Sequence, residues 1–125
     1  MKLNSSKSKT MVVSRSRPQQ PFHSHLKVNG VLVKEECCLK MQGMTLDTKM
    51  TYERHIRNSA SRVRQKTDTL RKAAAIFSDD ALLATCLRAY VLPLVEYCSP
   101  VWSFSAHASH LALLDRVLSA ANGTF

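Results

Sequence analysis

The chain has 125 residues, a mass of 14.0 kDa and 45% hydrophobic residues, which suits one small domain or a piece of a larger protein and excludes a complete polymerase. Eighteen Lys and Arg residues against nine acidic residues give a net charge of +9, which favours a polyanionic partner over an acidic small molecule. Nucleic acid is the first candidate for this partner, and an anionic membrane surface is the second.

The four cysteines form no C-x-x-C pair, so neither a zinc ribbon nor a disulfide framework is indicated. We interpret them as reduced thiols of an intracellular protein, in the nucleus or the cytoplasm. The start MKLNSSKSKT lacks the apolar run of a signal peptide. The most apolar window, Ala81–Val95, contains Arg88 and Pro93 and is shorter than the roughly 20 residues that span a bilayer. It predicts a buried helix, and of the two candidate partners we expect nucleic acid and not a membrane.

The first 48 residues favour short strands. Thr10–Ser14 is rich in the β-branched residues that suit a pleated surface. Asn29 and Gly30 lie between two matching apolar runs, and this dipeptide suits the positive φ angles of a type I′ turn. We therefore expect an antiparallel hairpin in which His25–Val28 pairs with Val31–Lys34.

A third extended run covers Cys37–Asp47. Gly43 lies in its middle, and a glycine inside a strand commonly marks a bulge or a close approach of another backbone. The run therefore predicts an extended segment with a bulge or a close backbone approach at Gly43.

Two histidines and two cysteines in this part of the chain raise the question of a metal site. His23 and His25 could join Cys37 and Cys38, because imidazole and thiolate groups bind zinc. However, H-x-H followed by C-C is not the usual ligand spacing, and adjacent residues of a strand point to opposite faces. We prefer loop histidines and half-buried thiols, and predict no metal.

From Thr51 the apolar pattern has the period of a helix. One stripe predicts the buried face, and it comprises Tyr52, Ile56, Ala60, Val63, Thr67, Leu70, Ala74 and Phe77. Between Lys49 and Lys72, eight positive residues against two acids give a net charge of +6. Such residues are normal on a solvated face, but few acids neutralise them, which favours binding to a nucleic-acid backbone without sequence preference. The candidate binding residues are Arg54, Arg57, Arg64, Arg71 and Lys72.

Two further helices are predicted. The first covers about Asp80–Cys98, is apolar nearly all round as in a helix enclosed by neighbours, and is kinked or ended by Pro93. The second begins near Ala106 and ends at Asn122-Gly123. Its expected buried residues are Leu111, Leu114, Val117 and Leu118. Tyr97 and Trp102 are expected to pack in the core and anchor this last helix.

The stretch AIFSDDALL contains two adjacent aspartates, Asp79 and Asp80. A polymerase can present metal-binding carboxylates in a similar pair, but it holds them in a tight turn between strands. Here one helix ends and another begins, and an Asp at such a position caps the free N–H groups of the first turn. We therefore expect a helix cap and no catalytic residue.

Five segments, taken together and in order, resemble the reverse transcriptases of non-LTR retrotransposons, the jockey-like LINE elements. They are MKLNSSKSKTMVVSRSR, VNGVLVKEE, GMTLDTKMTYERHI, LRKAAAIFSDDALLATCLRAYVLPLVEYCSPVW and HLALLDRV, and they cover essentially all 125 residues. The corresponding region of such enzymes follows the catalytic YADD box, completes the palm and continues into the thumb. The resemblance implies an α+β fold: a small antiparallel sheet or hairpin in residues 1–48 as palm remnant, then a thumb-like three-helix bundle in residues 49–125.

The resemblance also implies roles for individual residues. Asn4-Ser5-Ser6-Lys7 resembles the family's N-x-x-K motif, whose lysine is proposed to lie near the nucleotide phosphates, so Lys7 and its neighbour Lys9 join the candidate nucleic-acid-binding residues. Lys40–Asp47 resembles the primer grip, a hairpin that holds the 3′ end of the primer. Its central residues here are Gln42, Gly43 and Met44, with Gln42 where the family has leucine.

The family's YADD box and first catalytic aspartate have no counterpart in this sequence, so we expect a fragment that is not an enzyme on its own. Mg²⁺ would be a cofactor only in a full-length relative, and the expected partner is an RNA or DNA backbone, with no small-molecule substrate. Two alternatives stay open: a retained nucleic-acid-binding module without enzymatic activity, and a non-functional product of a decayed transposon.

Overall fold

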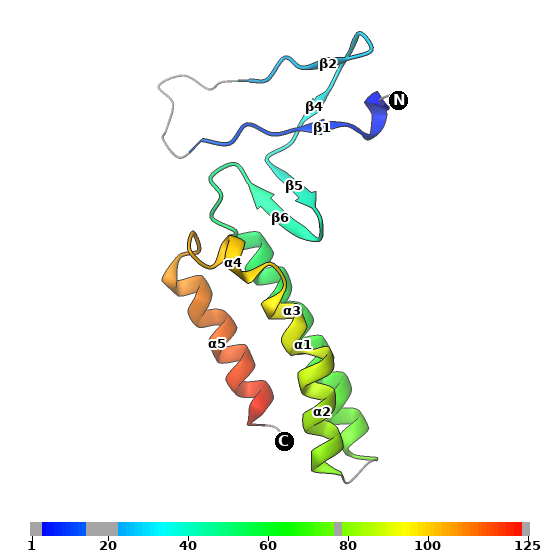
Figure 1. Ribbon diagram of the computed structural model, residues 1–125, viewed down its shortest axis with the longest axis vertical. Coiled ribbons are helices and arrows are strands. Elements are labelled where there is room, and N and C mark those ends of the chain that lie inside the picture. Colours follow the sequence, from blue (N-terminus) through cyan, green and yellow to red (C-terminus); the bar gives the residue numbers. More distant parts are fainter. Residues whose placement is uncertain (1–3, 15–22, 77–78, 124–125) are drawn as a thin grey trace. The chain divides into compact units, whose positions relative to one another are not determined.

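The structure is a computed structural model that describes residues 4–14, 23–76 and 79–123 (Figure 1). The chain divides into two compact units, Met1–Tyr52 and Glu53–Phe125. The first unit holds all the strands and the second holds all the α-helices among the described residues. The predicted mixture of α and β structure is therefore present, with small sheets preceding helices.

The first unit contains a 3₁₀ turn, η1, and three two-stranded sheets. Its elements are η1 (Ser5–Lys7), β1 (Lys9–Thr10), β2 (Lys27–Val28), β3 (Val31–Leu32), β4 (Lys34–Glu35), β5 (Cys38–Met41) and β6 (Met44–Asp47). The pairs β2·β3 and β5·β6 are antiparallel, whereas β1 pairs with β4 in parallel. The predicted strand Thr10–Ser14 is thus shorter and shifted, and the β structure is not one antiparallel sheet.

The hairpin predicted from Asn29 and Gly30 is confirmed. Both residues have positive φ angles, 52° and 79°, as a type I′ turn requires. Val28 pairs with Val31, which is the predicted register, although the two strands are only two residues long.

The prediction of a bulge at Gly43 is wrong, because β5 and β6 form a second hairpin. Met41 pairs with Met44, and the two residues between them, Gln42 and Gly43, have φ angles of 48° and 82°. Gly43 therefore supplies the second left-handed residue of a tight turn, where a glycine avoids the steric cost of a side chain. The resemblance implied a hairpin in this segment.

The second unit is built on the long helix α1 (Glu53–Ala74). The predicted stripe is buried at Ile56, Ala60, Val63 and Thr67, so the 3.6-residue period identified its packed face correctly. Leu70 and Ala74 are only half-buried, and Phe77 lies outside the described residues. Tyr52 is also buried, but it precedes the helix.

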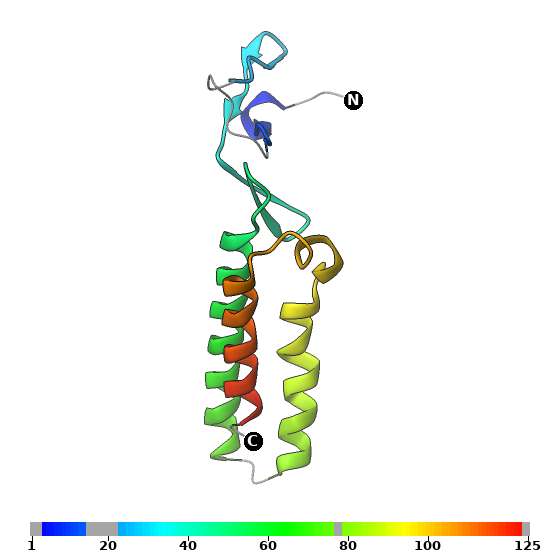
Figure 2. The same ribbon diagram turned by 90° about the vertical axis from the view of Figure 1, so that its left-hand side faces the viewer.

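Four helices follow α1: α2 (Asp80–Tyr90), α3 (Leu92–Glu96), α4 (Ser99–Trp102) and α5 (Ala108–Asn122). Pro93 lies in the first turn of α3, where its missing N–H costs no helical hydrogen bond, and this confirms the predicted break. Gly123 ends α5 as predicted. Helix α1 contacts α2, α3 and α5, and Figures 1 and 2 show α5 and α2 on different sides of it.

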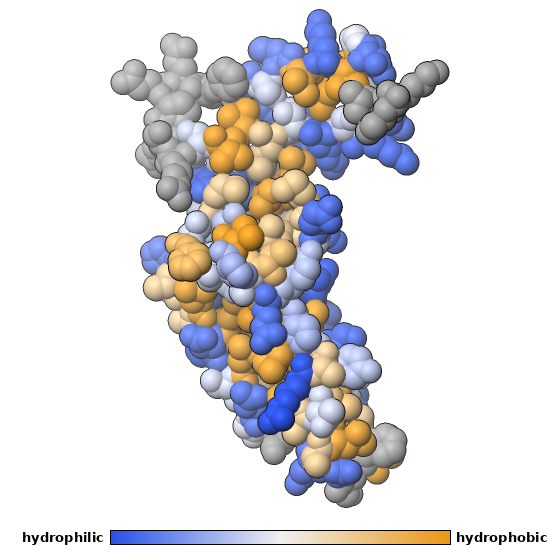
Figure 3. Space-filling view, in the orientation of Figure 1, coloured by the Kyte–Doolittle hydropathy of each residue, from blue (hydrophilic) through white to orange (hydrophobic). Residues whose placement is uncertain are grey.

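The predicted burial of the second helix on all sides is wrong. Leu83 and Leu87 are buried in α2, but Leu82 and Tyr90 on the same helix are 47% and 62% exposed. Apolar residues accordingly reach the surface around the start of α2 (Figure 3). A helix that is apolar all round predicts neighbours on all sides, whereas in this unit α2 packs chiefly on α1 and α3.

One stretch of the described residues, Asp80–Trp102, is long and apolar enough to cross a membrane. It is not one continuous helix, however, because Cys98 has a left-handed φ of 53°. The helical path from α2 through α3 ends at Glu96, which leaves fewer than the roughly 20 residues needed to span a bilayer. The stretch is therefore weak evidence for a membrane span.

The two predicted core aromatics differ in their environment. Trp102 is buried, and its indole N–H donates a hydrogen bond to the carbonyl of Tyr97 at 3.0 Å. Its ring lies 6.1 Å from that of buried His55 in α1. Tyr97 itself is 48% exposed, so its predicted core position is wrong. Of the two aromatics, only Trp102, the last residue of α4, lies in the core.

Candidate nucleic-acid interface

The five candidate basic residues of α1 are all exposed, because the buried stripe occupies the other side of the helix. Arg57 forms an ion pair with Glu53 at 2.8 Å, and Arg71 forms one with Asp68 at 3.3 Å. Within the described ranges, no ion pair involves Arg54, Arg64 or Lys72. The helix thus keeps a large excess of positive charge at its surface.

The basic residues do not form one row. Arg57, Arg64 and Arg71 are spaced by seven residues, which places them on one flank of the helix. Arg62 and Lys66, which were not among the candidates, lie on the other flank and line an open groove of about 450 Å³ that also includes Leu94 of α3. The sequence contained the signal for both residues: they are among the eight basic residues counted between Lys49 and Lys72, and the helical period places them outside the buried stripe.

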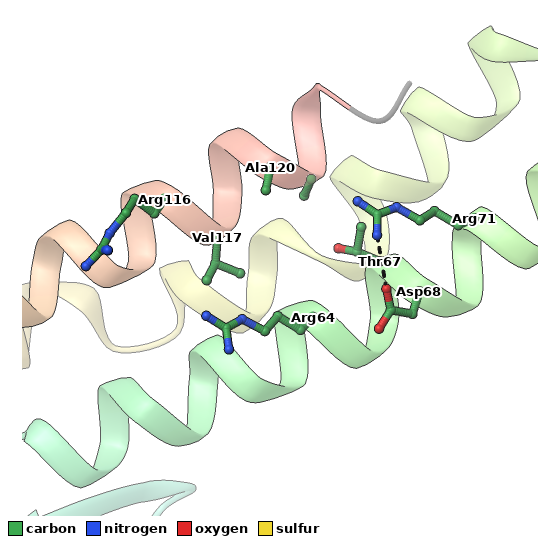
Figure 4. Close-up of a pocket in the computed structure, with 8 residues that line it drawn as sticks. Arg64, Thr67, Asp68, Arg71, Arg116, Val117 and Ala120 are labelled. Atoms are coloured by element: carbon green, nitrogen blue, oxygen red, sulfur yellow. Dashed lines mark hydrogen bonds and ion pairs between the residues drawn. The ribbon is translucent and has the colours of Figure 1, made fainter.

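A second groove, of about 290 Å³, runs between α1 and α5 (Figure 4). Three arginines line it: the predicted Arg64 and Arg71 from α1, and Arg116 from α5, which sequence reasoning missed. The only sequence signal for Arg116 is its place beside Val117, a residue predicted to be buried against the rest of the bundle. Asp68, the one acid that lines this groove, is bound to Arg71.

The floor of this groove is apolar. Val117 and Ala121 of α5 are buried, as is Thr67 of α1. The hydroxyl of Thr67 donates to the carbonyl of Val63 at 2.9 Å, so it is already engaged within the helix. Positive charge is therefore confined to the edges of the groove.

In the first unit, Lys7 ends the turn η1 and is exposed. The side chain of Asn4 accepts the backbone N–H of Ser6 at 3.0 Å, and the Asn4 carbonyl accepts the N–H of Lys7 at 3.2 Å. The N-x-x-K segment thus forms a capped turn that presents Lys7 to solvent. Lys9 is also exposed but forms an ion pair with Glu36 at 3.4 Å, which partly neutralises it.

The primer-grip-like residues occupy the turn of the β5·β6 hairpin. Gln42 and Gly43 are exposed, whereas Met44 is buried. Only the first two are accessible to a ligand. The segment thus offers a polar turn and an apolar side chain that is already packed.

Asp79 is the N-cap of α2, as predicted. Its carboxylate accepts the backbone N–H groups of Ala81 and Leu82 at 3.0 and 3.1 Å. Across residues 4–14, 23–76 and 79–123, no three His, Cys, Asp or Glu side chains gather as a metal-binding group would. His23 instead lies 3.6 Å from a carboxylate oxygen of Glu35.

Comparisons with known proteins give no match to a family model, to a curated protein or to a solved structure.

Proposed function

We propose that this chain binds the backbone of RNA or DNA through the exposed basic surface of α1. In this proposal the first unit is a palm remnant and the second a thumb-like bundle from a non-LTR retrotransposon reverse transcriptase, the family that the sequence resembles. We assign no catalytic role to any residue of the chain, and Mg²⁺ would act only in a full-length relative.

One observation carries the proposal: α1 buries one face, and basic side chains greatly outnumber acidic ones on the rest of its surface. Ile56 and Val63 are fully buried, which fixes the orientation of the helix, and α1 carries seven basic residues against two acidic ones. Basic side chains that neutralise phosphates release condensed counterions, which favours binding to any nucleic-acid strand. The absence of a base-reading pattern in the sequence supports binding without sequence preference.

Fluorescence anisotropy with short single-stranded and duplex oligonucleotides tests the proposal. Five phosphate contacts predict that affinity for duplex DNA falls about 500-fold between about 50 and about 200 mM salt. Scrambling the oligonucleotide sequence should leave the affinity nearly unchanged. A chain that binds no nucleic acid at the lower salt concentration would contradict the proposal.

A matched pair of triple variants assigns the binding to α1. Replacing Arg54, Arg57 and Arg64 by Gln removes three charges from this helix. The control replaces three other exposed basic residues by Gln, namely Lys27, Lys40 and Arg88. Both proteins lose the same net charge, so a larger loss of affinity in the α1 variant supports the assignment, and equal losses contradict it.

The alternative of a non-functional product makes a different prediction. Such a chain would lack a cooperative unfolding transition, because selection would not maintain its packing. A single sharp transition by circular dichroism, together with nucleic-acid binding, would argue against it. Primer extension with Mg²⁺ addresses catalysis directly: we expect no incorporation, and incorporation by the purified chain would show that an active site has been missed.

A further inference from the structure

We propose that α1 and α5 together bind one phosphodiester group of a nucleic-acid strand, in the groove rimmed by Arg64, Arg71 and Arg116. This inference rests on the proposed function and deepens it, because it replaces a diffuse basic surface with a defined site. It also assigns to α5 a binding role that the sequence analysis did not predict.

The rim of the groove has the chemistry that a phosphate requires. Three guanidinium groups and one carboxylate leave an excess of two positive charges. A guanidinium presents its N–H donors in a planar fork that matches two phosphate oxygens, which a lysine ammonium does not. Figure 4 shows Arg64 reaching from α1 toward α5 near Val117, and Arg71 directed toward Thr67 and Asp68.

The floor and the size of the groove select the kind of ligand. Val117, Ala121 and Thr67 offer an apolar surface, against which the edge of a sugar can pack. The volume of about 290 Å³ lies just below the range of about 300–1,000 Å³ that is typical of ligand pockets. The groove therefore fits a phosphate with its adjoining sugar and leaves the rest of the strand outside.

Because the arginines come from two helices, a phosphate in the groove would bridge α1 and α5. A ligand that binds only this folded arrangement stabilises it in proportion to the logarithm of its concentration. The melting temperature of the full chain should therefore rise with added oligonucleotide, and Arg116→Gln should reduce this rise.

Two neighbouring positions of α5 provide a matched test. Ala120 lines the groove and Ser119 does not, and both are exposed, so each tolerates a larger side chain. Ala120→Glu places a carboxylate among the arginines, whereas Ser119→Glu adds the same charge outside the groove. We expect Ala120→Glu to weaken oligonucleotide binding about tenfold or more, and Ser119→Glu about threefold or less. Circular dichroism confirms that both variants are folded.

Arginine variants test the rim. Arg116→Gln should lower the slope of log affinity against log salt by about 0.9, the value for one phosphate contact. Arg116→Lys should recover only part of the affinity, because the charge returns without the fork. Arg62→Gln, on the opposite flank of α1, removes the same charge outside the groove and should cost less.

The outcomes separate this inference from the proposed function. If the unmodified chain binds no oligonucleotide, the proposed function fails. If it binds and the two glutamate variants lose equal affinity, the groove is not the site, while binding through α1 survives. A free phosphate is distinguished by NMR of the Val117 methyl groups: an oligonucleotide should shift them at concentrations where inorganic phosphate does not, and equal shifts by both would overturn the assignment to a phosphodiester.

Discussion

The carboxylate of Asp47 accepts the backbone N–H of Tyr52, the residue before α1, at 2.8 Å. The same carboxylate also accepts the N–H groups of Lys49 and Thr51 and the hydroxyl of Thr51, each at 3.0 Å. Met50 and Tyr52 have positive φ angles of 54° and 56°, which non-glycine residues adopt only when their surroundings enforce them. Four hydrogen bonds to one side chain supply that constraint.

Replacing Asp47 by Ala should therefore lower the free energy of unfolding by about 2–3 kcal/mol, because several backbone N–H groups lose a charged acceptor. Urea denaturation followed by circular dichroism measures the change. Asp115→Ala is the control, since this aspartate is exposed on α5, and it should change stability by less than about 0.5 kcal/mol. Equal effects of the two substitutions would show that the Asp47 hydrogen bonds contribute nothing specific.

The same carboxylate predicts a dependence on acid. Partial burial raises the pKa of Asp47, but the hydrogen bonds from Thr51, Tyr52 and Lys49 outweigh it and leave the pKa below its ordinary value. Since the pKa is lower in the folded chain, this contribution to stability is present above the unfolded pKa of about 3.9 and is lost as pH falls through the folded pKa. The urea midpoint should decrease as the pH is lowered below about 4, and it should decrease less steeply in Asp47→Asn. Parallel profiles for the two proteins would exclude this contribution.

The parts of the fold that the sequence predicted are those specified by local interactions. The stripe of Ile56 and Val63 fixed the buried face of α1, and Asn29-Gly30 fixed the first hairpin, because helix period and turn conformation depend on nearby residues. Gln42-Gly43 forms an equivalent turn, but Gln is not a typical residue of a type I′ turn, so the sequence favoured a bulge there.

The parts that could not be predicted depend on packing between distant segments. The composition of α2 cannot show that only the side with Leu83 and Leu87 finds a partner. In the same way, Arg116 enters the candidate site only because α5 packs beside α1. All five candidates on α1 itself were correctly expected to be exposed from charge and period alone, but no local pattern pairs a residue of one helix with the groove of another.

The cap of α2 makes a prediction about two adjacent residues. Asp79 accepts two N–H groups, whereas Asp80 lies in the first helical turn. Asp79→Ala should lower the free energy of unfolding by about 1 kcal/mol, the usual effect of losing an N-cap. Asp80→Ala should cost about 0.5 kcal/mol or less, because it removes only a favourable interaction with the helix dipole. Thermal denaturation ranks the two variants, and the reverse order would contradict the capping role of Asp79.

His55 predicts a second dependence on pH, nearer neutrality. Burial lowers the pKa of its imidazole, and the positive charge of Arg62 lowers it further. The unfolded chain, with a His pKa of about 6.5, then binds a proton more readily than the folded chain, so stability falls as pH drops below about 6.5. The slope from this residue is at most about 1.4 kcal/mol per pH unit. His55→Phe should flatten the stability profile between about pH 7 and about pH 5.

The control for this measurement is His25→Gln, which alters an exposed histidine in the first unit. Its profile should match that of the unmodified chain. A flattened profile in this control, or an unchanged one in His55→Phe, would assign the pH dependence to other groups.

The exposed apolar side chains of α2 allow packing within the helical unit to be tested separately from association between copies of the chain. Leu82→Lys and Tyr90→Lys should each change the free energy of unfolding by less than about 0.5 kcal/mol, since both side chains are substantially exposed. Leu87→Ala, on the buried side, should cost about 2–5 kcal/mol. The lysine variants should also remain monomeric at higher protein concentration in sedimentation velocity, because they interrupt an exposed apolar surface. Lysine variants as unstable as Leu87→Ala would mean that this side of α2 is packed in solution, and α2 would then be enclosed as its composition first indicated.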